Sequence, residues 1–214
     1  FTQKGGVMNV IVDGVCVGAQ SYWNAEATML NHCRGALIMT GQGCMLLTGK
    51  RALEFSGSVA APTNNGIGGL EEIMGPNGEA QYAAADLKEA YDILFRHYDF
   101  TYVPKGNSYV PLVNTEDPLH RALNATPYEA EESFDRVGDI FSTSRNPGRK
   151  QPFSIREVMG AVLDRDVEPL ERWKNLDGGE SAVVYHGQLG GCPLTCIGIE
   201  SKATPRRGSR PIDG

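Results

Sequence analysis

The sequence predicts an α/β fold, because short apolar runs typical of buried strands alternate with segments of helical periodicity. Residues 8–12 (MNVIV), 36–40 (ALIMT) and 44–48 (CMLLT) are the apolar runs. Residues 18–32 follow a helical pattern between the first two runs, and residues 49–55 predict a short helix after the third. The order strand, turn, helix, strand, strand, helix therefore organises the first part of the chain.

Two predicted helices carry apolar side chains at helical spacing. In residues 18–32 two adjacent stripes are apolar, and they consist of Tyr22, Ala25 and Met29 beside Trp23, Ala27 and Leu30. The clearest helical pattern runs from Asp86 to Tyr98. Its apolar side chains recur at helical spacing, and they are Leu87, Ala90, Tyr91, Leu94, Phe95 and Tyr98. An amphipathic helix of a globular protein normally turns such a face toward the core.

Residues 104–152 differ from both flanks, because they contain six prolines, many acids and little periodicity. This composition predicts a linker or extended arm. Beyond it, Ser154 and Glu157 have the spacing of a capping box, which predicts the start of a helix. Two apolar runs at 182–189 and 193–199, joined through a pair of glycines, predict a β-hairpin. We therefore expect three parts, which are residues 1–103, 104–152 and 153–214.

Composition and charge narrow the class of protein. The formal net charge of −6 at pH 7 disfavours general nucleic-acid binding. No apolar run reaches the roughly 18 residues that a membrane-spanning helix needs. The five cysteines are odd in number and lie mostly in apolar surroundings, which favours reduced thiols and a cytoplasmic protein. Their spacing fits no CxxC pattern, so no metal site is predicted. The chain opens at Phe1 without an initiator methionine, and we expect a fragment of a longer protein.

The turn at Gly18 is the leading candidate for chemistry. An apolar strand leads through Gly18 directly into a helix, so the first amides of that helix are expected to lack intrahelical partners. The helix dipole adds partial positive charge there, and small residues such as Ala19 let a carbonyl oxygen approach within about 3 Å. Such a turn stabilises a developing oxyanion, for example the enolate of a thioester. A glycine required only by a tight turn is the alternative interpretation.

Several segments, in order along the chain, resemble the carboxyltransferase family of biotin-dependent acyl-CoA carboxylases. They are VCVGAQSYW, LIMTGQGCMLLTGKRALEFSG, NNGIGG, MGPNGEAQY, GDIF, NPGRKQPFSIREVM and LGGCPLTCIGIES. The resemblance runs from residue 1 to about residue 202, the variable arm excepted, and is strongest to acetyl- and propionyl-CoA carboxylases. It implies a crotonase-like (ClpP/crotonase) ββα spiral, of which this chain holds part of the first lobe and the start of the second.

The resemblance also implies a reaction and a site. Members of the family transfer a carboxyl group from N1-carboxybiotin to the α-carbon of an acyl-CoA, which gives malonyl-CoA or methylmalonyl-CoA. The oxyanion hole for the thioester enolate maps onto the backbone of Gly18 and Ala19, where Ala19 replaces a glycine of many members. The acyl-CoA site is expected to include Tyr22, Gly68 and Gly69, although an ordinary loop is the alternative for the two glycines. The hole for the biotin ureido oxygen is expected beyond this chain.

Biotin is expected on a separate domain or subunit, because the chain lacks the Met-Lys-Met sequence expected around a biotinylated lysine. The expected partners are acyl-CoA, biotin carboxylase and biotin carboxyl carrier domains, the rest of the second lobe, and further copies in a homo-oligomer with its active site at the interface. The fragment alone is expected to be inactive. Because the family mechanism requires no side-chain base, the four histidines are expected to be structural or solvated.

Two other functions stay open. Another crotonase-fold acyl-CoA enzyme, such as a hydratase or decarboxylase, would use side-chain acids or bases in its cleft. A non-catalytic assembly segment would instead present an apolar packing surface to a partner lobe. The basic tail with Arg206, Arg207 and Arg210 could meet CoA phosphates, with a solvated loop as the alternative.

Overall fold

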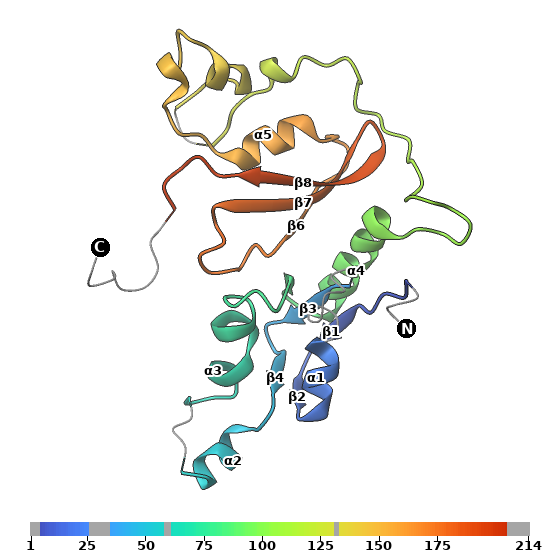
Figure 1. The fold of residues 1–214 in the computed structure, drawn as a ribbon, viewed down its shortest axis with the longest axis vertical. Coiled ribbons are helices and arrows are strands. Elements are labelled where there is room, and N and C mark those ends of the chain that lie inside the picture. Colours follow the sequence, from blue (N-terminus) through green and yellow to red (C-terminus); the bar gives the residue numbers. More distant parts are fainter. Residues whose placement is uncertain (1–4, 26–34, 58–60, 131–132, 205–214) are drawn as a thin grey trace. The chain divides into compact units, whose positions relative to one another are not determined.

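The computed structural model describes residues 5–25, 35–57, 61–130 and 133–204 (Figure 1). The chain divides into two compact units. The first unit comprises Phe1–Arg96 together with Trp173–Asp177, and the second comprises His97–Arg172 together with Gly178–Gly214. The boundary between them therefore falls within a helix, and a short later segment returns to the first unit.

Two parallel sheets form the centre of the first unit. One sheet has the strand order β1-β3-β5, and the other pairs β2 with β4. The strands are β1 (Val10–Val12), β2 (Val15–Val17), β3 (Leu37–Thr40), β4 (Cys44–Leu46) and β5 (Tyr82–Ala84). Val10 pairs with Leu37 in the first sheet, and Val15 with Cys44 in the second. The strands predicted from the three apolar runs are confirmed, each somewhat shorter than its run.

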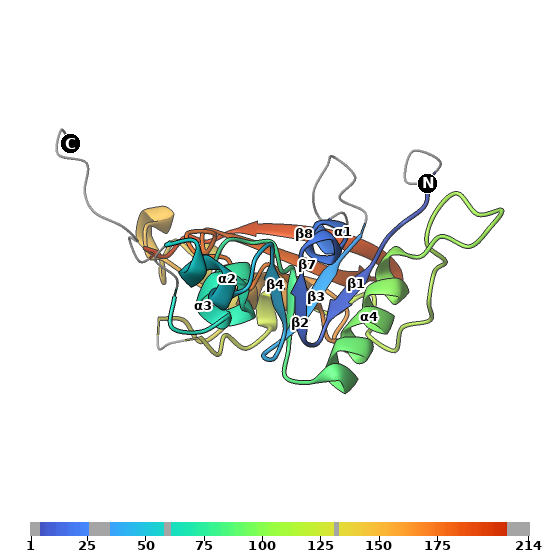
Figure 2. The ribbon, with the colours of Figure 1, turned by 90° about the horizontal axis from the view of Figure 1, so that it is seen from below.

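A repeated ββα order connects the two sheets. The chain contributes β1 to the first sheet, turns at Asp13 and Gly14 into β2 of the second, and then forms α1 (Ala19–Ala25). It repeats this order with β3, β4 and α2 (Lys50–Phe55), and the strands of the two repeats are neighbours in Figures 1 and 2. Two short helical turns, α3 (Asn65–Gly68) and the π-helical η2 (Leu70–Met74), precede β5. This order is the one expected of a ββα spiral.

The core of the first unit lies on β3 and β4. Every residue of both strands is buried, which explains why their sequences are uninterrupted apolar runs rather than alternating ones. The main apolar cluster consists of Val12, Leu37, Met39, Met45, Leu70 and Ala80. Cys16 of β2 and Met74 of η2 pack against it from the edge. The covered strands fix the position of the turns that follow them.

The face that α1 buries differs from the predicted one. Tyr22 is 62% exposed and Trp23 is 72% exposed, whereas Ser21 and Asn24 are buried. Ser21 and Asn24 lie three positions apart and so share a face of the helix. Of the predicted apolar stripes, Tyr22 and Trp23 therefore lie at the surface, whereas Ala25 packs against the core cluster. The predicted remainder of this stripe, at residues 27–30, lies outside the described residues.

The helix α4 (Leu87–Thr101) confirms the predicted helix but buries a different face. Its buried side chains follow helical spacing, and they are Ala90, Ile93, His97 and Phe100. Four members of the predicted face are exposed, and they are Leu87, Tyr91, Phe95 and Tyr98. Apolar residues occupy two neighbouring stripes of this helix, and a histidine stands within the buried one. The apolar pattern alone therefore pointed to the wrong stripe.

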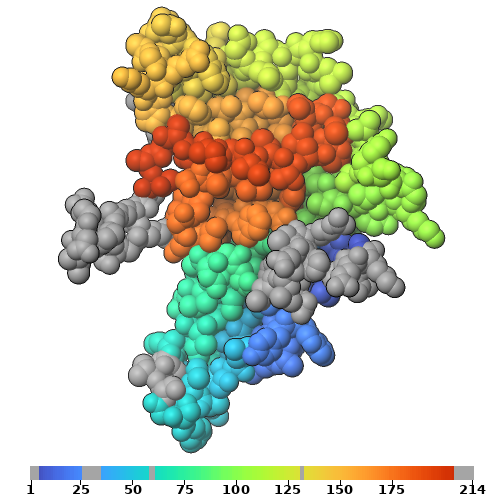
Figure 3. Space-filling model, viewed as in Figure 1, coloured from blue at the N-terminus to red at the C-terminus, as the bar shows by residue number. Residues whose placement is uncertain are grey.

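The second unit is built on an antiparallel sheet of order β6-β7-β8. Its elements are β6 (Leu170–Arg172), β7 (Ala182–Leu189), β8 (Cys192–Ile199) and α5 (Ile155–Val162). Pairing from Ala182 with Ile199 to Leu189 with Cys192 confirms the predicted hairpin. Met159 of α5 packs on Val183 and Tyr185 of β7, and β8 lies open at the surface, red in Figure 3.

The start of α5 differs from the predicted capping box. Ser154 occupies the N-cap position, but its side chain makes no capping hydrogen bond. The Glu200 carboxylate instead lies 3.4 Å from the Ile155 amide. A residue that is distant in sequence therefore supplies the negative charge at this helix start, which local spacing could not reveal.

Residues 104–152, predicted as a linker or extended arm, pack within the second unit. An apolar cluster joins this segment to α5, and it consists of Tyr128, Phe134, Val137, Ile140 and Ala161. Arg121 donates to the carbonyl of Leu163 at 2.8 Å and pairs with Asp117 at 2.7 Å, so it caps the end of α5. The segment also forms three 3₁₀ turns, η3 (Leu123–Ala125), η4 (Val137–Phe141) and η5 (Pro147–Arg149). The lobe boundaries at residues 103 and 152 stay a prediction.

The segment Trp173–Asp177 completes the first unit. The Trp173 amide donates to the Gln81 carbonyl at 2.9 Å, and its indole N–H donates to the Gly78 carbonyl at 3.1 Å. The Asp177 amide donates to the Pro76 carbonyl at 2.9 Å. Trp173 has a φ of 56°, which is unusual for a bulky residue, and these bonds hold it there. The segment is thus an integral part of the unit.

Candidate functional site

The predicted turn at Gly18 forms as expected. β2 ends at Val17, Gly18 has a φ of 71°, and α1 begins at Ala19. Glycine adopts this left-handed backbone conformation without the penalty that a side chain would bring. A Cβ added at Gly18 would meet no atom within 4 Å, so the backbone angle rather than crowding requires glycine here.

The amides of this turn are not equivalent. The Gly18 N–H donates to the Leu46 carbonyl at 2.8 Å, which extends the pairing of β2 with β4 by one residue. The expectation of an unengaged amide at Gly18 is therefore wrong. The next two amides, of Ala19 and Gln20, have no hydrogen-bond acceptor among the residues that the structure describes, and both residues are exposed. The available donors of the turn thus begin one residue later than expected.

Ser21 fixes the turn to β4, a role that the sequence did not indicate. Its hydroxyl lies 2.9 Å from the Leu46 carbonyl and 3.1 Å from the Cys16 carbonyl, and the residue is only 5% exposed. Its amide donates to the Gly18 carbonyl at 3.0 Å. A small polar residue two positions after the helix start was the available signal. Its partners on two strands could not be read from spacing.

Gly68 and Gly69 approach the same strand from another part of the chain. A Cβ at Gly68 would lie 2.0 Å from the Met45 carbonyl oxygen, and one at Gly69 would lie 2.7 Å from the Asn65 backbone. Both glycines are buried. The Gly68 amide donates to the backbone carbonyl of Asn64, and the Gly69 amide donates to that of Asn65. Absence of a side chain at Gly68 is therefore what allows α3 to pack on β4. The structure brings Gly18 and Gly68, fifty positions apart, to neighbouring residues of β4.

The cysteine nearest this arrangement is Cys44, the first residue of β4. Its thiol donates to the Asn65 side-chain oxygen at 2.8 Å. Burial raises the pKa of the Cys44 thiol, and nearby Cys16 raises it further. A thiol with a raised pKa stays protonated near neutral pH and is a poor nucleophile. Cys44 is therefore not a candidate nucleophile.

Two histidines, His97 and His186, are buried in the second unit. Their rings meet edge to face at 5.5 Å between centroids, and the His186 Nδ1 lies 2.9 Å from the Thr195 hydroxyl. Burial, and then the charge of Arg172, lower the pKa of His186 to about 4. A neutral imidazole among packed side chains fits the structural role expected for it. His120 is exposed, and His32 lies outside the described residues.

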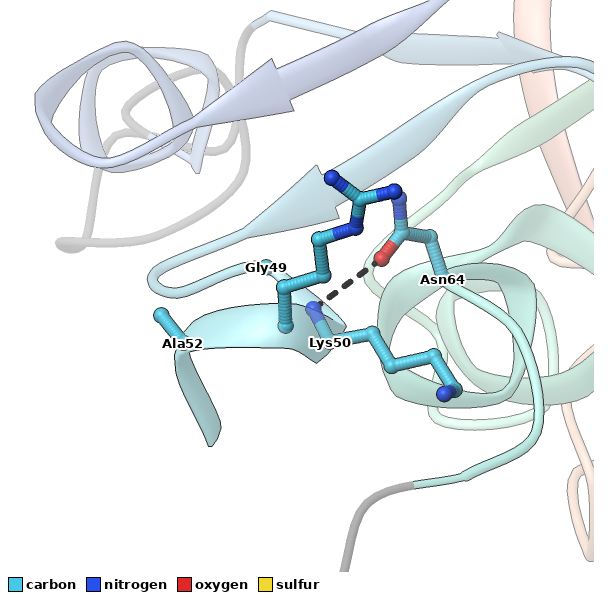
Figure 4. A pocket seen from close by; sticks show the side chains of 5 residues that line it. Gly49, Lys50, Ala52 and Asn64 are labelled. Carbon is cyan, nitrogen blue, oxygen red and sulfur yellow. Dashed lines mark hydrogen bonds between the residues drawn. The ribbon is translucent and has the colours of Figure 1, made fainter. Parts of the chain in front are cut away.

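A pocket beside the first unit's helices was not predicted. It has a volume of about 470 Å³ and is lined by Gly49, Lys50, Arg51, Ala52 and Asn64. The Lys50 amide donates to the Asn64 side-chain oxygen at 3.2 Å, and Figure 4 shows this bond at the pocket. The Lys50 ammonium pairs with Glu54. Two adjacent cationic residues thus line one concave surface.

Two absences hold for the described part of the chain. Within it, no group of three or more His, Cys, Asp or Glu side chains is placed to hold a metal ion. None of its helices has both the length and the apolar character needed to cross a membrane. The basic tail with Arg206, Arg207 and Arg210 lies outside the described residues.

Comparison with known proteins places these features in a family context. A family model described as the carboxyl transferase domain matches residues 6–207. Transcarboxylase 12S, solved in its hexamer with hydrolysed methylmalonyl-CoA bound, is similar with a TM-score of 0.66 at 19% identity, over 91% of this chain and 33% of that one. A second structure of it, with methylmalonyl-CoA and methylmalonic acid bound, gives the same values over 32% of its length.

A single-chain, multidomain long-chain acyl-CoA carboxylase is also similar, with a TM-score of 0.61 at 15% identity, over 91% of this chain and 16% of that one. These similarities confirm the crotonase-like fold expected from the sequence. The chain spans about a third of the length of the transcarboxylase chains that it matches.

Proposed function

The chain belongs to the carboxyl transferase domain family, and on that premise we propose that it supplies the acyl-CoA half of a biotin-dependent carboxyltransferase site. The reaction would move a carboxyl group from N1-carboxybiotin to the α-carbon of acetyl- or propionyl-CoA, giving malonyl-CoA or methylmalonyl-CoA. The methylmalonyl-CoA bound in one structure of transcarboxylase 12S, and its hydrolysed form bound in another, support this class of substrate.

The proposal rests on one observation, the available amide of Ala19. This amide lies at the start of α1, belongs to an exposed residue, and has no acceptor among the described residues. An N–H group in this position is oriented outward along the helix axis and is reinforced by the partial positive charge of the helix start. We assign Ala19 as the donor to the thioester oxygen and Gly18 as the residue that positions it.

The chemistry needs little more from this chain than that donor. When the α-proton leaves the acyl group, the electron pair of the C–H bond moves into the enolate and places negative charge on the thioester oxygen. The Ala19 amide stabilises that charge, and the enolate carbon then forms its new C–C bond to CO2. When bound, carboxybiotin would supply the CO2 by cleavage of its N1–carboxyl bond, and the biotin nitrogen freed by that cleavage would accept the α-proton. Loss of one positioned oxyanion donor typically slows such reactions about 10²- to 10³-fold.

The rest of the proposed acyl-CoA site surrounds the same strand. Gly18 bonds to Leu46, and Gly68 packs on Met45, so both glycine turns are anchored on adjacent residues of β4. We propose that Gly68 and Gly69 form one wall of the site and that Tyr22, exposed on α1, contacts the substrate. In this role the glycines act by permitting close packing, since their amides are already bonded within α3.

The proposed partners follow from the same assignment. Biotin would reach this site on a carrier domain after carboxylation by a biotin carboxylase, and no residue of this chain is assigned to hold it. The remaining part of the second lobe, from a further copy in a homo-oligomer, would complete the site. The exposed apolar side chains Val15 and Val17 of β2 support such packing. We place the protein in the cytoplasm.

Carboxyl transfer is preferred here over hydration or decarboxylation by other crotonase-fold enzymes, because the family model that matches residues 6–207 is the carboxyl transferase domain. A hydratase would in addition need a side-chain acid or base within hydrogen-bond reach of the reacting atoms.

The test measures recognition of the thioester oxygen itself. Calorimetry would compare binding of acetyl-CoA with binding of S-ethyl-CoA, which lacks the carbonyl oxygen. We expect the chain to prefer acetyl-CoA about fivefold, which corresponds to one hydrogen bond of average strength. Ala19→Pro should abolish the preference, because proline has no N–H yet fits the first position of a helix.

The matched control is Ala19→Ser, which keeps the amide and should keep the preference for acetyl-CoA. Circular dichroism would verify that α1 and the sheets persist in both variants. An undiminished preference for acetyl-CoA in Ala19→Pro would remove the oxyanion role from this turn.

A further inference from the structure

We propose that the pocket lined by Lys50, Arg51 and Asn64 binds a phosphate of the nucleotide end of acyl-CoA. This inference rests on the proposed function, and it adds to it a second contact point for the same substrate. The pocket is concave, has a volume of about 470 Å³, and combines two cationic residues with a side-chain amide. A phosphate group matches this chemistry, because guanidinium and amide N–H groups are its common donors.

The orientation of Asn64 provides the first support. Its side-chain oxygen accepts the Lys50 amide proton at 3.2 Å, as Figure 4 shows. That bond identifies the oxygen end of the amide and leaves the nitrogen end as a donor of two hydrogens. In the part of the chain that the structure describes, this nitrogen has no acceptor. An anionic oxygen would satisfy it.

The charges at the pocket provide the second support. The Lys50 ammonium is partly neutralised by Glu54, one turn further along α2. Arg51 is exposed and has no ion-pair partner among the described residues. The net charge of the lining residues is therefore positive even with Glu54 counted. An anionic ligand would therefore meet a complementary charge at this surface.

The position of the pocket provides the third support. Asn64 directly precedes α3, which ends at Gly68, and Gly49 follows β4 after two residues. The pocket is therefore attached to the same strand and the same short helix that carry the proposed thioester site. Both belong to the first unit. The pantetheine arm of CoA separates its thioester from its phosphates, so a phosphate contact is expected near the thioester site rather than at it.

The test separates phosphate recognition from thioester recognition. Calorimetry would measure binding of acetyl-CoA and of acetyl-pantetheine, which carries the thioester without the nucleotide. Arg51→Gln should weaken acetyl-CoA binding about threefold to tenfold and leave acetyl-pantetheine binding unchanged. Asn64→Asp should weaken acetyl-CoA binding at least as much, because it keeps the acceptor for the Lys50 amide while adding a negative charge.

Lys105→Gln is the charge-matched control, since Lys105 is exposed and belongs to the second unit. It should leave acetyl-CoA binding unchanged at physiological salt. Inorganic pyrophosphate should compete with acetyl-CoA in the unmodified chain and lose this competition in Arg51→Gln. Pyrophosphate that binds without competing would show an anion site for some other ligand and would overturn the assignment to CoA.

The outcomes also distinguish this inference from the proposed function. Equal effects of Arg51→Gln and Lys105→Gln, or equal loss of acetyl-pantetheine binding in Arg51→Gln, would overturn the phosphate contact and leave the Ala19 assignment standing. Conversely, failure of Ala19→Pro to change carbonyl recognition would remove the thioester site, while an Arg51-dependent difference between acetyl-CoA and acetyl-pantetheine would still support the phosphate contact.

Discussion

Two glycine turns, one in each unit, differ in whether the protein supplies a carboxylate acceptor for their backbone amides. In the second unit, Gly190 and Gly191 join β7 to β8, and each donates to one oxygen of the Asp164 carboxylate at 2.7 Å. Asp164 is 5% exposed, so the protein has buried its own anion against these amides. In the first unit, the amides after Gly18 meet no such acceptor within the described residues. A turn that carries its own carboxylate is structural, whereas one that lacks it can receive the oxygen of a ligand.

The largest expected effect comes from removing the acceptor of the turn at Gly190 and Gly191. Asp164→Ala would leave two amides of the hairpin without their acceptor, and we expect the free energy of unfolding of the second unit to fall by about 3 kcal/mol. Urea unfolding followed by circular dichroism would measure it. Asp164→Asn, which keeps one acceptor oxygen, should lose less. An unchanged midpoint in Asp164→Ala would show that the carboxylate contributes nothing to the turn.

The next effect depends on pH and concerns the same unit. His186 has a pKa of about 4 in the folded chain, below the ordinary value of 6.5. As pH falls from 6.5 to 4, His186 becomes protonated in the unfolded chain but stays neutral in the folded chain. The free energy of unfolding therefore declines through this window, and the loss is complete below it. We expect a loss on the order of 2 kcal/mol.

The pH profile of urea unfolding would measure this loss, with His186→Gln as the control because its side chain stays neutral. The groups that face His186 are His97, Phe100, Arg172 and Thr195. Equal slopes for the histidine and glutamine proteins between pH 6.5 and 4 would contradict the prediction.

The smallest expected effect is on the turn at Gly18. Ser21→Ala removes the hydroxyl that holds α1 to Cys16 and Leu46, and we expect stability to fall by about 1 kcal/mol. The preference for acetyl-CoA over S-ethyl-CoA should fall with it, since Ser21 positions the amide that would read the carbonyl. Ser21→Thr keeps a hydroxyl and should restore part of both. A loss of stability with full carbonyl preference would limit Ser21 to a purely structural role.

The predictable features were those encoded by neighbouring residues. The strands of the first unit, the turn at Gly18 and the hairpin at Gly190 each follow from local patterns, and the order of strands and helices gave the ββα architecture. The buried faces of α1 and α4 were predicted wrongly, because aromatic residues such as Trp23 and Phe95 are apolar yet exposed. Apolar periodicity shows which residues share a face, but tertiary contacts decide which face is covered.

The candidate site likewise depends on tertiary contacts that local sequence patterns do not reveal. The Gly18 turn was visible in the sequence, but the bond from Gly18 to Leu46 depends on strand pairing across 28 positions. The packing of residues 104–152 was likewise hidden, since its cluster members Tyr128, Phe134, Val137 and Ile140 pack against Ala161 of α5, more than twenty residues later. The pocket at Arg51 requires Asn64, thirteen residues later, to come beside it. No spacing rule connects such residues before the fold is known.

The return of Trp173–Asp177 to the first unit has a consequence for dissecting the molecule. The polypeptide leaves that unit after Arg96 and comes back for five residues, so no uninterrupted gene segment that stops earlier encodes all of it. A shortened chain that ends at residue 103 would lack Trp173–Asp177. This segment donates hydrogen bonds to the carbonyls of Pro76, Gly78 and Gln81. We therefore expect each unit to express better when its gene includes every segment that belongs to the unit than when the chain is simply cut at one position.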